Sequence, residues 1–481
     1  MKNLLKAITL IILYLLSIAF SQVDLIDISL IISIITSIFL VFYIKTICKS
    51  YSNLTIVFYA FSVLYGLSGP INVYWGEGLA NIFGDLYDVG SFISVFCISN
   101  IGFIIGILFY NLFNKGKSNF VFKDISRLFL KEKVLIKSSL IFAFISMSFE
   151  LINFMRVGGI SALIQGKAYY QSAISELSVT VPVNYFADFA FAFFSLYIGI
   201  NINRRKKNNK MKILRFIIYM MPYLFVNIYL GKRGVLLSII IIIFIGVTYL
   251  KPIKSIRPKL IIMVLLLYII MGFLYANRGI APLLFTDKNT FFELAFQKER
   301  IVKALNPGSN EFGAPFGNFN MFYINSNNKF DLLLGKSYVN GIFLMIPSII
   351  YPGNKPQQIG YIFRDVYFPS EALRGSIAGT AFSSILEAYW NFSYFGVFFM
   401  YLFIGYMLQR LDKRISNKNW KSLVFYISLS PLVISFHRVS FGNIISAIAF
   451  KGIILYIFVC IFSCFIFDRN HNKVNNGFGE K

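Results

Sequence analysis

Long apolar segments, separated by short polar ones, recur along the whole chain. A helix needs about 20 apolar residues to cross about 30 Å of hydrocarbon. Backbone groups in lipid must be paired internally, which favours helices, because the strands of a membrane barrel would alternate and run to only about 10 residues. The pattern therefore predicts an all-α fold, a polytopic transmembrane helix bundle of about twelve spans. The predicted spans are 4–21, 25–44, 54–71, 89–113, 134–154, 182–201, 213–230, 235–250, 260–276, 380–408, 422–436 and 444–467.

The polar segments between the spans alternate in charge. The first two segments that follow an odd-numbered span, 21–24 and 72–88, contain only acidic charges. Because Lys and Arg are enriched in cytoplasmic loops, the basic segments are predicted to be cytoplasmic, which places both termini in the cytoplasm. The basic segments are 45–49, 115–133, 204–212, 251–259 and 410–421.

One polar segment, 277–379, is much longer than the others. A loop of that length is generally functional rather than a simple connection. Its apolar piece 342–352 is too short to cross the membrane and contains two prolines, so we expect an interfacial or re-entrant element there. The chain thus divides into an N-terminal bundle of about nine spans, a large and partly helical periplasmic loop, the C-terminal spans and a cytoplasmic tail. These parts are 1–276, 277–379, 380–467 and 468–481.

Composition narrows the functional classes. Hydrophobic residues make up 57% of the chain and charged residues only 14%, against roughly a quarter charged in soluble domains. A net charge of +25 would suggest nucleic acid on a soluble protein, but here the cations gather in cytoplasmic loops, so we expect no nucleic-acid partner. With four cysteines, none of them in the long loop, and two histidines, neither a disulfide framework nor a metal site is expected. No motif for a nucleotide or another cofactor is present.

Arginines near the predicted outer ends of the spans are the first candidate site residues. A guanidinium group binds phosphate oxygens with a planar fork and keeps its charge, and a neighbouring glycine lets a phosphate approach the backbone. Each arginine alone is more typical of a solvated or headgroup-facing anchor, whereas the set favours an anion site for a pyrophosphate. The candidates are Arg233 in the turn 231–234, Arg278, Arg364, Arg374, and Arg438 with its neighbour His437.

Ionisable side chains inside membrane spans are costly and are functional candidates by default. Asp188, Glu387 and Lys451 lie within predicted spans, and Glu150 lies near the outer end of another. One interpretation is a structural ion pair of Lys451 with Asp188 or Glu387. The other is that Glu387 acts as a base or orients a sugar hydroxyl.

Two stretches of the sequence resemble the O-antigen polymerase (Wzy-type) family of oligosaccharide repeat unit polymerases. The layout of about a dozen spans with one large late loop is also similar to that family. In this chain the Asn-Phe-Gly element of the family is lengthened by an insertion. The stretches are Gly231-Lys232-Arg233-Gly234, and 374–396 with Arg374-Gly375-Ser376, Glu387-Ala388-Tyr389 and Asn391-Phe392-Ser393-Tyr394-Phe395-Gly396.

The resemblance implies a membrane glycosyltransferase of GT-C-like architecture in the bacterial inner membrane. It implies polymerisation of undecaprenyl-pyrophosphate-linked repeat units into O-antigen, capsular polysaccharide or exopolysaccharide at the periplasmic face. The implied partners are these lipid-linked glycans, membrane lipids, and the flippase and chain-length regulator of the same pathway, with no cofactor.

In the mechanism that we expect, cations stabilise the charge that develops on the leaving pyrophosphate. Glu387 is the expected base, with Asp188 as the second choice and as a substrate-binding group. The expected cations are Arg233, Arg278 and Arg374 first, followed by Arg364 and Arg438 with His437 beside it.

Two other classes remain open at this point. A lipid-linked oligosaccharide flippase or another transporter would also have about twelve spans and buried charges, but such proteins have short loops and matched halves. An O-antigen ligase typically has a histidine in the late loop, whereas the outer histidine here, His437, lies in a different loop.

Overall fold

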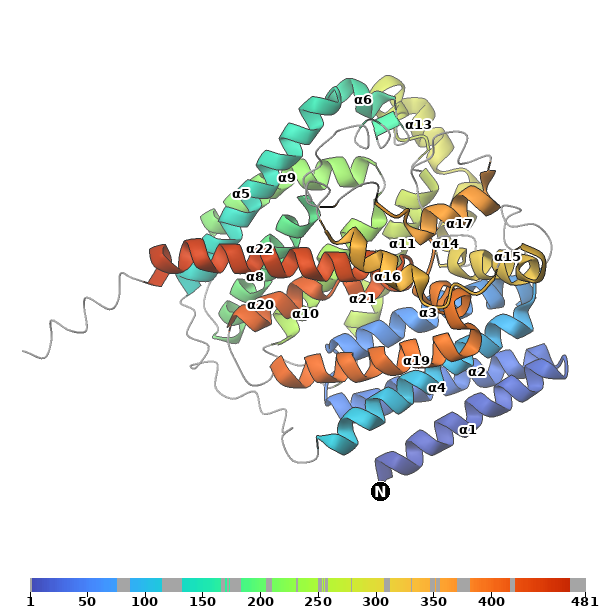
Figure 1. Cartoon of the computed structure of the whole chain (residues 1–481). Coiled ribbons are helices and arrows are strands. Elements are labelled where there is room, and N and C mark those ends of the chain that lie inside the picture. The colour runs from blue at the N-terminus through green and yellow to red at the C-terminus, as the bar shows by residue number, and fades with distance from the viewer. Residues whose placement is uncertain are drawn as a thin grey trace, which may run out of the picture.

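The fold of the described residues is helical throughout (Figure 1). No strand occurs in these parts of the chain. The computed structural model describes residues 2–75, 87–114, 132–165, 169–170, 173, 183–204, 210–230, 232–249, 253, 255, 258–277, 279–306, 312–329, 331–346, 351, 355–369, 381–415 and 420–467.

Nine of the described helices are long and apolar enough to cross a membrane, which identifies a multi-pass membrane protein. Three further predicted spans coincide with shorter apolar helices, so the count of about twelve stays a prediction. The nine are α1 (Lys2–Gln22), α2 (Ile26–Cys48), α3 (Leu54–Trp75), α4 (Val89–Phe113), α5 (Glu132–Val157), α8 (Val183–Asn203), α9 (Lys210–Tyr229), α19 (Ser384–Ile415) and α22 (Phe441–Phe467). The shorter ones are α10 (Arg233–Tyr249), α11 (Pro258–Asn277), and α20 (Trp420–Leu429) with α21 (Leu432–Ser435).

The long helices pack in two groups, as Figure 1 shows. Helices α1 to α4 lie with α19, and α5 lies with α8, α9, α10 and α20. Helices α4 and α19 approach closely because glycines face backbone. A Cβ at Gly106 would lie 2.1 Å from the carbonyl oxygen of Leu402. Small residues permit this contact in membranes, where packing rather than apolar burial drives helix association.

The described residues of the predicted outer loop form short helices at one end of the bundle (Figure 1). Helix α16 packs against α22 where Gly341 meets Gly442, a contact too close for either residue to carry a Cβ. Of the apolar piece 342–352, residues 347–350 and 352 lie outside the described residues, and its interfacial position stays a prediction. The helices are α12 (Leu283–Thr286), α13 (Lys288–Ala295), α14 (Lys298–Leu305), α15 (Ala314–Lys329), α16 (Lys336–Leu344) and α17 (Ile359–Tyr367).

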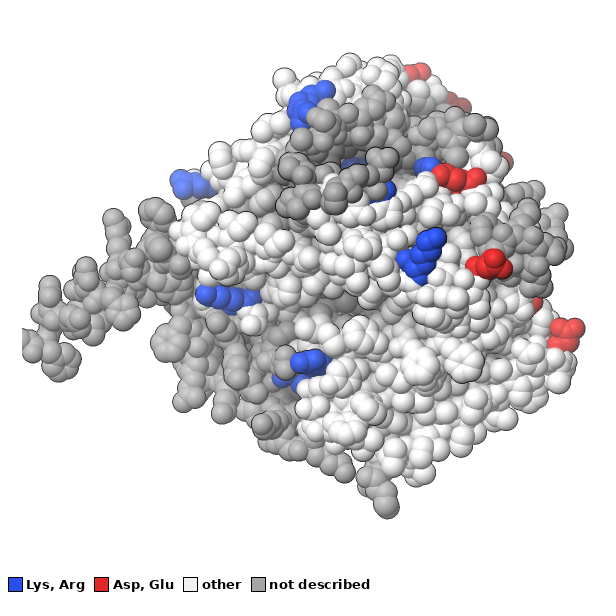
Figure 2. Space-filling model, viewed as in Figure 1, with Lys and Arg blue, Asp and Glu red and all other residues white. Residues whose placement is uncertain are grey.

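Charged side chains are sparse on the face shown in Figure 2. The acidic ones gather toward the end of the molecule where α15 and α17 lie, while basic ones also occur toward the opposite end. This separation follows the alternation of charge seen in the sequence. The cytoplasmic location of both termini nevertheless stays a prediction.

Candidate functional site

A cavity of about 440 Å³ is rich in charged side chains. It lies between α8, the turn before α10, and the segment that joins α21 to α22. Four cationic side chains and one carboxylate line it, and we call it the cationic cavity. The charged residues are Lys232, Arg233, Arg438, Lys451 and Asp188, and polar neighbours include Asn184, Tyr223, Ser238 and Asn443.

Two of the predicted arginines meet in this cavity, although they are about 200 positions apart in the sequence. Arg233 is the first residue of α10, and its guanidinium carbon lies 3.8 Å from the centroid of the Tyr275 ring. Arg438 approaches from the other side: its Nη1 atom lies 3.2 Å from the position that a Cβ would take at Gly234. The glycine after Arg233 therefore leaves room for a second guanidinium group, and Tyr65 on α3 lies close to both.

The buried ion pair that the sequence left open is formed by Asp188. The Nζ atom of Lys451 lies 2.6 Å from Oδ2 of Asp188 and also donates to the carbonyl oxygen of Ser428. Both side chains are buried. The pair joins α8 to α22 at the wall of the cationic cavity, so each side chain offsets part of the cost of burying the other.

Lys232 adds a further cation that the sequence analysis did not single out by itself. It precedes α10 and lines the cavity beside Arg233. Burial lowers the pKa of Lys232, and the nearby carboxylate of Glu150 opposes that effect. Its place in the Gly-Lys-Arg-Gly turn was the available signal, whereas nothing local indicated that Tyr275 would cover Arg233.

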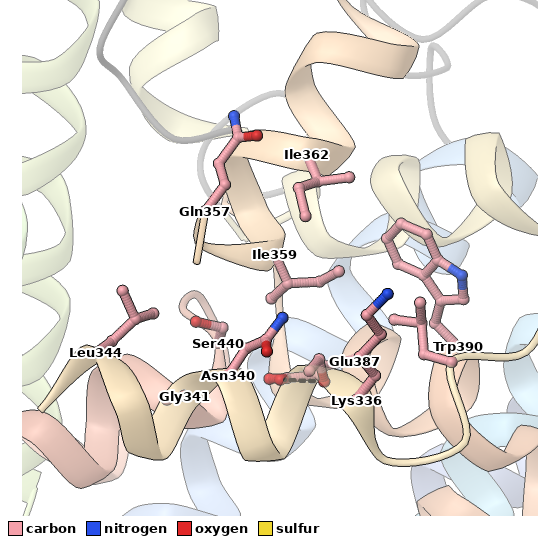
Figure 3. A pocket seen from close by; sticks show the side chains of 13 residues that line it. Lys336, Asn340, Gly341, Leu344, Gln357, Ile359, Ile362, Glu387, Trp390 and Ser440 are labelled. Carbon is pink, nitrogen blue, oxygen red and sulfur yellow. Dashed lines mark hydrogen bonds between the residues drawn. The ribbon is translucent and has the colours of Figure 1, made fainter. Parts of the chain in front are cut away.

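Glu387 lies outside the cationic cavity. It lines a second cavity of about 250 Å³ with residues such as Lys336, Asn340 and Trp390 (Figure 3). Its side chain is fully buried, and it accepts hydrogen bonds from Oγ of Ser337 at 2.7 Å and from the backbone N–H of Phe441 at 2.6 Å. The carboxylate thus connects three elements, α16, α19 and α22.

The segment that carried the family resemblance contains a break in α19. Phe392 and Ser393 leave the helical conformation, and Ser393 has a φ of 52°. The carbonyl oxygens of Trp390 and Asn391 before the break accept hydrogen bonds from backbone N–H groups at 333–334. The side chain of Asn391 accepts from the N–H of Gly335 and donates to Ser337. The Glu-Ala-Tyr and Asn-Phe elements therefore anchor the outer segment before α16.

Two further candidates lie away from the cationic cavity. His437 is buried, with Nε2 3.3 Å from the carbonyl oxygen of Phe58 and its ring stacked on Tyr65 at 5.6 Å between centroids. Arg364 on α17 pairs with its neighbour Asp365 at 2.5 Å. Arg278 and Arg374 lie outside the described residues.

Among the described residues no group of three or more His, Cys, Asp and Glu side chains is arranged to hold a metal ion. The positive charge available to an anion in this region comes from the side chains of the cationic cavity. Four cationic side chains against one carboxylate leave the cavity lining with an excess of positive charge, which suits a ligand with several negative charges, because ionised donors form charge-assisted hydrogen bonds.

Part of the chain matches the model of a known protein family. Residues 319–470 match the family model of the O-antigen polysaccharide polymerase Wzy, less than half of the 481-residue chain. The match confirms the resemblance seen in the sequence, and it contains Arg364, Glu387 and Arg438 but not Arg233 or Asp188. No curated protein and no solved structure matches the chain.

Proposed function

We propose that this protein joins undecaprenyl-pyrophosphate-linked oligosaccharide repeat units into O-antigen, capsular polysaccharide or exopolysaccharide chains at the periplasmic face of the bacterial inner membrane. The family match supports polysaccharide repeat-unit polymerisation and lipid-linked substrates. The observation that carries the finer proposal is the cationic cavity, where Arg233 and Arg438 converge with Lys232 inside an apolar bundle. A lipid diphosphate is the ligand that this combination of charge and surroundings fits best.

The leaving group of the proposed reaction is the lipid diphosphate. The acceptor hydroxyl oxygen forms a bond to the anomeric carbon of the donor sugar, and the bond from that carbon to the diphosphate oxygen breaks. The electron pair of the broken bond stays on the diphosphate. Arg233, Arg438 and Lys232 stabilise the charge that develops there, because fixed cations in a site of low dielectric act most strongly on such charge.

The acceptor hydroxyl must also lose its proton. Asp188 is the carboxylate that lines the cationic cavity, and Lys451 pairs with it at 2.6 Å. We therefore propose Asp188 as the proton acceptor. Glu387, the first choice from the sequence, lies in the second cavity with hydrogen bonds to both of its carboxylate oxygens. Arg278, Arg364 and Arg374 remain proposed ligands of the substrate, and a GT-C-like architecture remains part of the proposal.

A transporter or flippase is the second candidate function. It would bind the same lipid diphosphate through the same cations, so the cavity alone does not separate the two. The family match favours the polymerase. The products separate them directly, because a flippase moves a repeat unit without changing its length.

The test uses the full-length protein in lipid nanodiscs with a lipid-linked repeat unit as the only substrate. The wild-type protein is expected to form glycans of two or more units and to release the lipid diphosphate. Arg438→Ala should lower the rate by about 10²-fold or more, the scale expected when one donor to developing charge is removed. Arg156→Ala, an exposed arginine of α5, is the matched control and should leave the rate unchanged.

Two outcomes would overturn the proposal. One is a wild-type protein that leaves the repeat unit unextended while moving it across the bilayer of a vesicle, which indicates the flippase. The other is full activity of Arg438→Ala and Arg233→Ala at normal protein levels, which removes the cationic cavity from catalysis. A separate reaction with added lipid A core tests for a ligase, which would transfer the repeat unit to that core instead of to a second repeat unit.

A further inference from the structure

The first turn of α19 holds the segment that carries Arg438 at three points. The backbone N–H of Ser384 donates to the carbonyl oxygen of Phe436 at 3.3 Å, and its Oγ donates to the carbonyl oxygen of Val439 at 2.9 Å. The backbone N–H of Phe441 donates to Oε2 of Glu387 at 2.6 Å. These three bonds lie on both sides of Arg438 in the sequence, so they fix the backbone from which its guanidinium extends into the cationic cavity.

The bond from Phe441 differs from the other two because its acceptor is a carboxylate oxygen and not a backbone carbonyl. Phe441 is the first residue of α22, and the N–H groups at a helix start have no partner within the helix. A carboxylate that accepts such an N–H forms a charge-assisted bond and interacts favourably with the positive end of the helix dipole. Glu387 also lies in the first turn of its own helix, α19. A buried carboxylate at this point is therefore stabilised by the starts of two helices.

The other oxygen of Glu387 connects to the outer segment. Oε1 accepts from Oγ of Ser337 in the first turn of α16. Ser337 in turn accepts a hydrogen bond from the side-chain amide of Asn391 at 2.7 Å. Figure 3 shows Glu387 against α16, with its hydrogen bond drawn as a dashed line. The outer segment and the turn that carries Arg438 thus meet at one carboxylate.

The segment that joins α21 to α22 contributes residues to the linings of both cavities. Val439 and Asn443 face the cationic cavity, whereas Ser440 and Gly442 face the cavity of Glu387. The segment is therefore the wall between the two cavities. A displacement of this wall moves Arg438, because Arg438 is directly adjacent to it in the chain.

On the basis of the proposed function, we infer that Glu387 is a positioning residue for polymerisation: by accepting the N–H of Phe441 it holds Arg438 in the geometry that binds the donor diphosphate. This role differs from that of a base. It requires two hydrogen-bond acceptor positions and a fixed shape, and it requires no exchange of a proton with substrate.

Glutamine separates the two roles. The side-chain oxygen of a glutamine at this position accepts the N–H of Phe441, and its amide nitrogen donates to the Ser337 hydroxyl, which has acceptor capacity for two bonds. Glu387→Gln therefore keeps the connection but removes the base, whereas Glu387→Ala removes both. Ser384→Ala removes the bond to Val439 without touching Glu387 and provides a milder test of the same connection.

The experiment measures three quantities on each full-length variant in nanodiscs. They are the polymerisation rate, the dissociation constant for undecaprenyl diphosphate, and hydrogen exchange of the peptide that contains 436–441. We expect Glu387→Gln to stay within about threefold of wild type in all three. We expect Glu387→Ala to lose about 10- to 100-fold in rate, as misplaced catalytic groups do, with weaker diphosphate binding and faster exchange. Ser384→Ala should change all three in the same direction but by less.

Three results would overturn the positioning role. The first is a Glu387→Gln variant as inactive as Glu387→Ala, which makes Glu387 a proton acceptor. The second is faster exchange in Glu387→Ala without any change in diphosphate binding or rate, which leaves a purely structural residue. The third is unchanged exchange in both Glu387→Ala and Ser384→Ala. Hydrogen exchange and diphosphate binding do not depend on catalysis, so together they test the positioning of Arg438 even where the polymerisation assay shows the proposed function to be wrong.

Discussion

Arg438 and Gly234 come from different elements of the cationic cavity wall and lie close together. Nη1 of Arg438 lies 3.2 Å from the place that a side-chain carbon on Gly234 would occupy, which is tighter than an ordinary van der Waals contact. The contact brings a guanidinium from the segment before α22 against the first turn of α10, where Arg233 begins the helix. Glycine at this position therefore determines how closely the two cationic groups approach.

The first prediction concerns this contact. Gly234→Ala should push the Arg438 side chain away by a few tenths of an ångström and lower the polymerisation rate several-fold, while Gly234→Val should lower it further. The measurement is the rate of repeat-unit joining per amount of folded protein. Gly452→Ala is the matched control, because nothing lies within 4 Å of a Cβ at that position. Equal rates for Gly234→Val and Gly452→Ala would show that the approach of Arg438 has no role in the reaction.

The second prediction separates the structural and chemical roles of Asp188. Removing one partner of a buried ion pair leaves an uncompensated charge and typically costs about 3–5 kcal/mol, whereas removing both is much less costly. Lys451→Met and Asp188→Asn alone should therefore reduce thermal stability strongly, and the double variant should recover most of it. Thermal unfolding of the purified variants measures this. If Asp188 takes up the acceptor proton, the double variant folds but does not polymerise.

An active double variant would contradict the proposed proton transfer but not the ion pair. Its rate should be compared with that of the wild type at equal protein levels. The converse result, a double variant no more stable than either single variant, would show that Asp188 and Lys451 do not act as a pair in the folded protein.

The helices and part of the site follow from local features of the sequence. Apolar length alone predicted each long helix, because in lipid every backbone group must bond within its own segment. A glycine-flanked arginine where a span begins was enough to indicate Arg233. Arg438 was a candidate because it follows a predicted span at its outer end, together with other arginines at the same end of the bundle.

The remaining features depend on contacts between distant parts of the chain. The sequence predicted Glu387 as a base because a carboxylate in an apolar span is costly, but it gave no sign of the bonds from Ser337 and Phe441, about 50 positions away on either side. The partner of Lys451 was likewise undetermined until α8 and α22 were placed together. Arg364 resembled the other outer arginines, but it pairs with Asp365 on its own helix. Periodicity and spacing contain no information about such pairings.

The last prediction concerns the end of the bundle away from the outer helices, where Asp412 joins three spans. Its carboxylate accepts hydrogen bonds from the backbone N–H groups of Leu54 and Thr55 at 3.2 and 3.1 Å, from Oγ1 of Thr55 at 2.6 Å and from the hydroxyl of Tyr426 at 2.5 Å. Asp412 on α19 thereby caps the start of α3 and is also bonded to Tyr426 on α20. Asp412→Asn replaces one accepting oxygen by a donor, which leaves one backbone N–H, that of Leu54 or of Thr55, without its carboxylate acceptor, and a lost buried acceptor costs about 1–3 kcal/mol.

We therefore expect Asp412→Asn to lower the melting temperature of the purified protein and its amount in the membrane, while the rate per folded molecule stays near that of wild type. Thermal unfolding and the polymerisation rate, measured on the same preparation, check this. Asp27→Asn is a suitable control, since Asp27 accepts a bond from the exposed indole of Trp75 and should matter little for stability. A variant of normal stability but low rate would indicate that Asp412 acts on the reaction, for which its four hydrogen bonds to α3 and α20 give no reason.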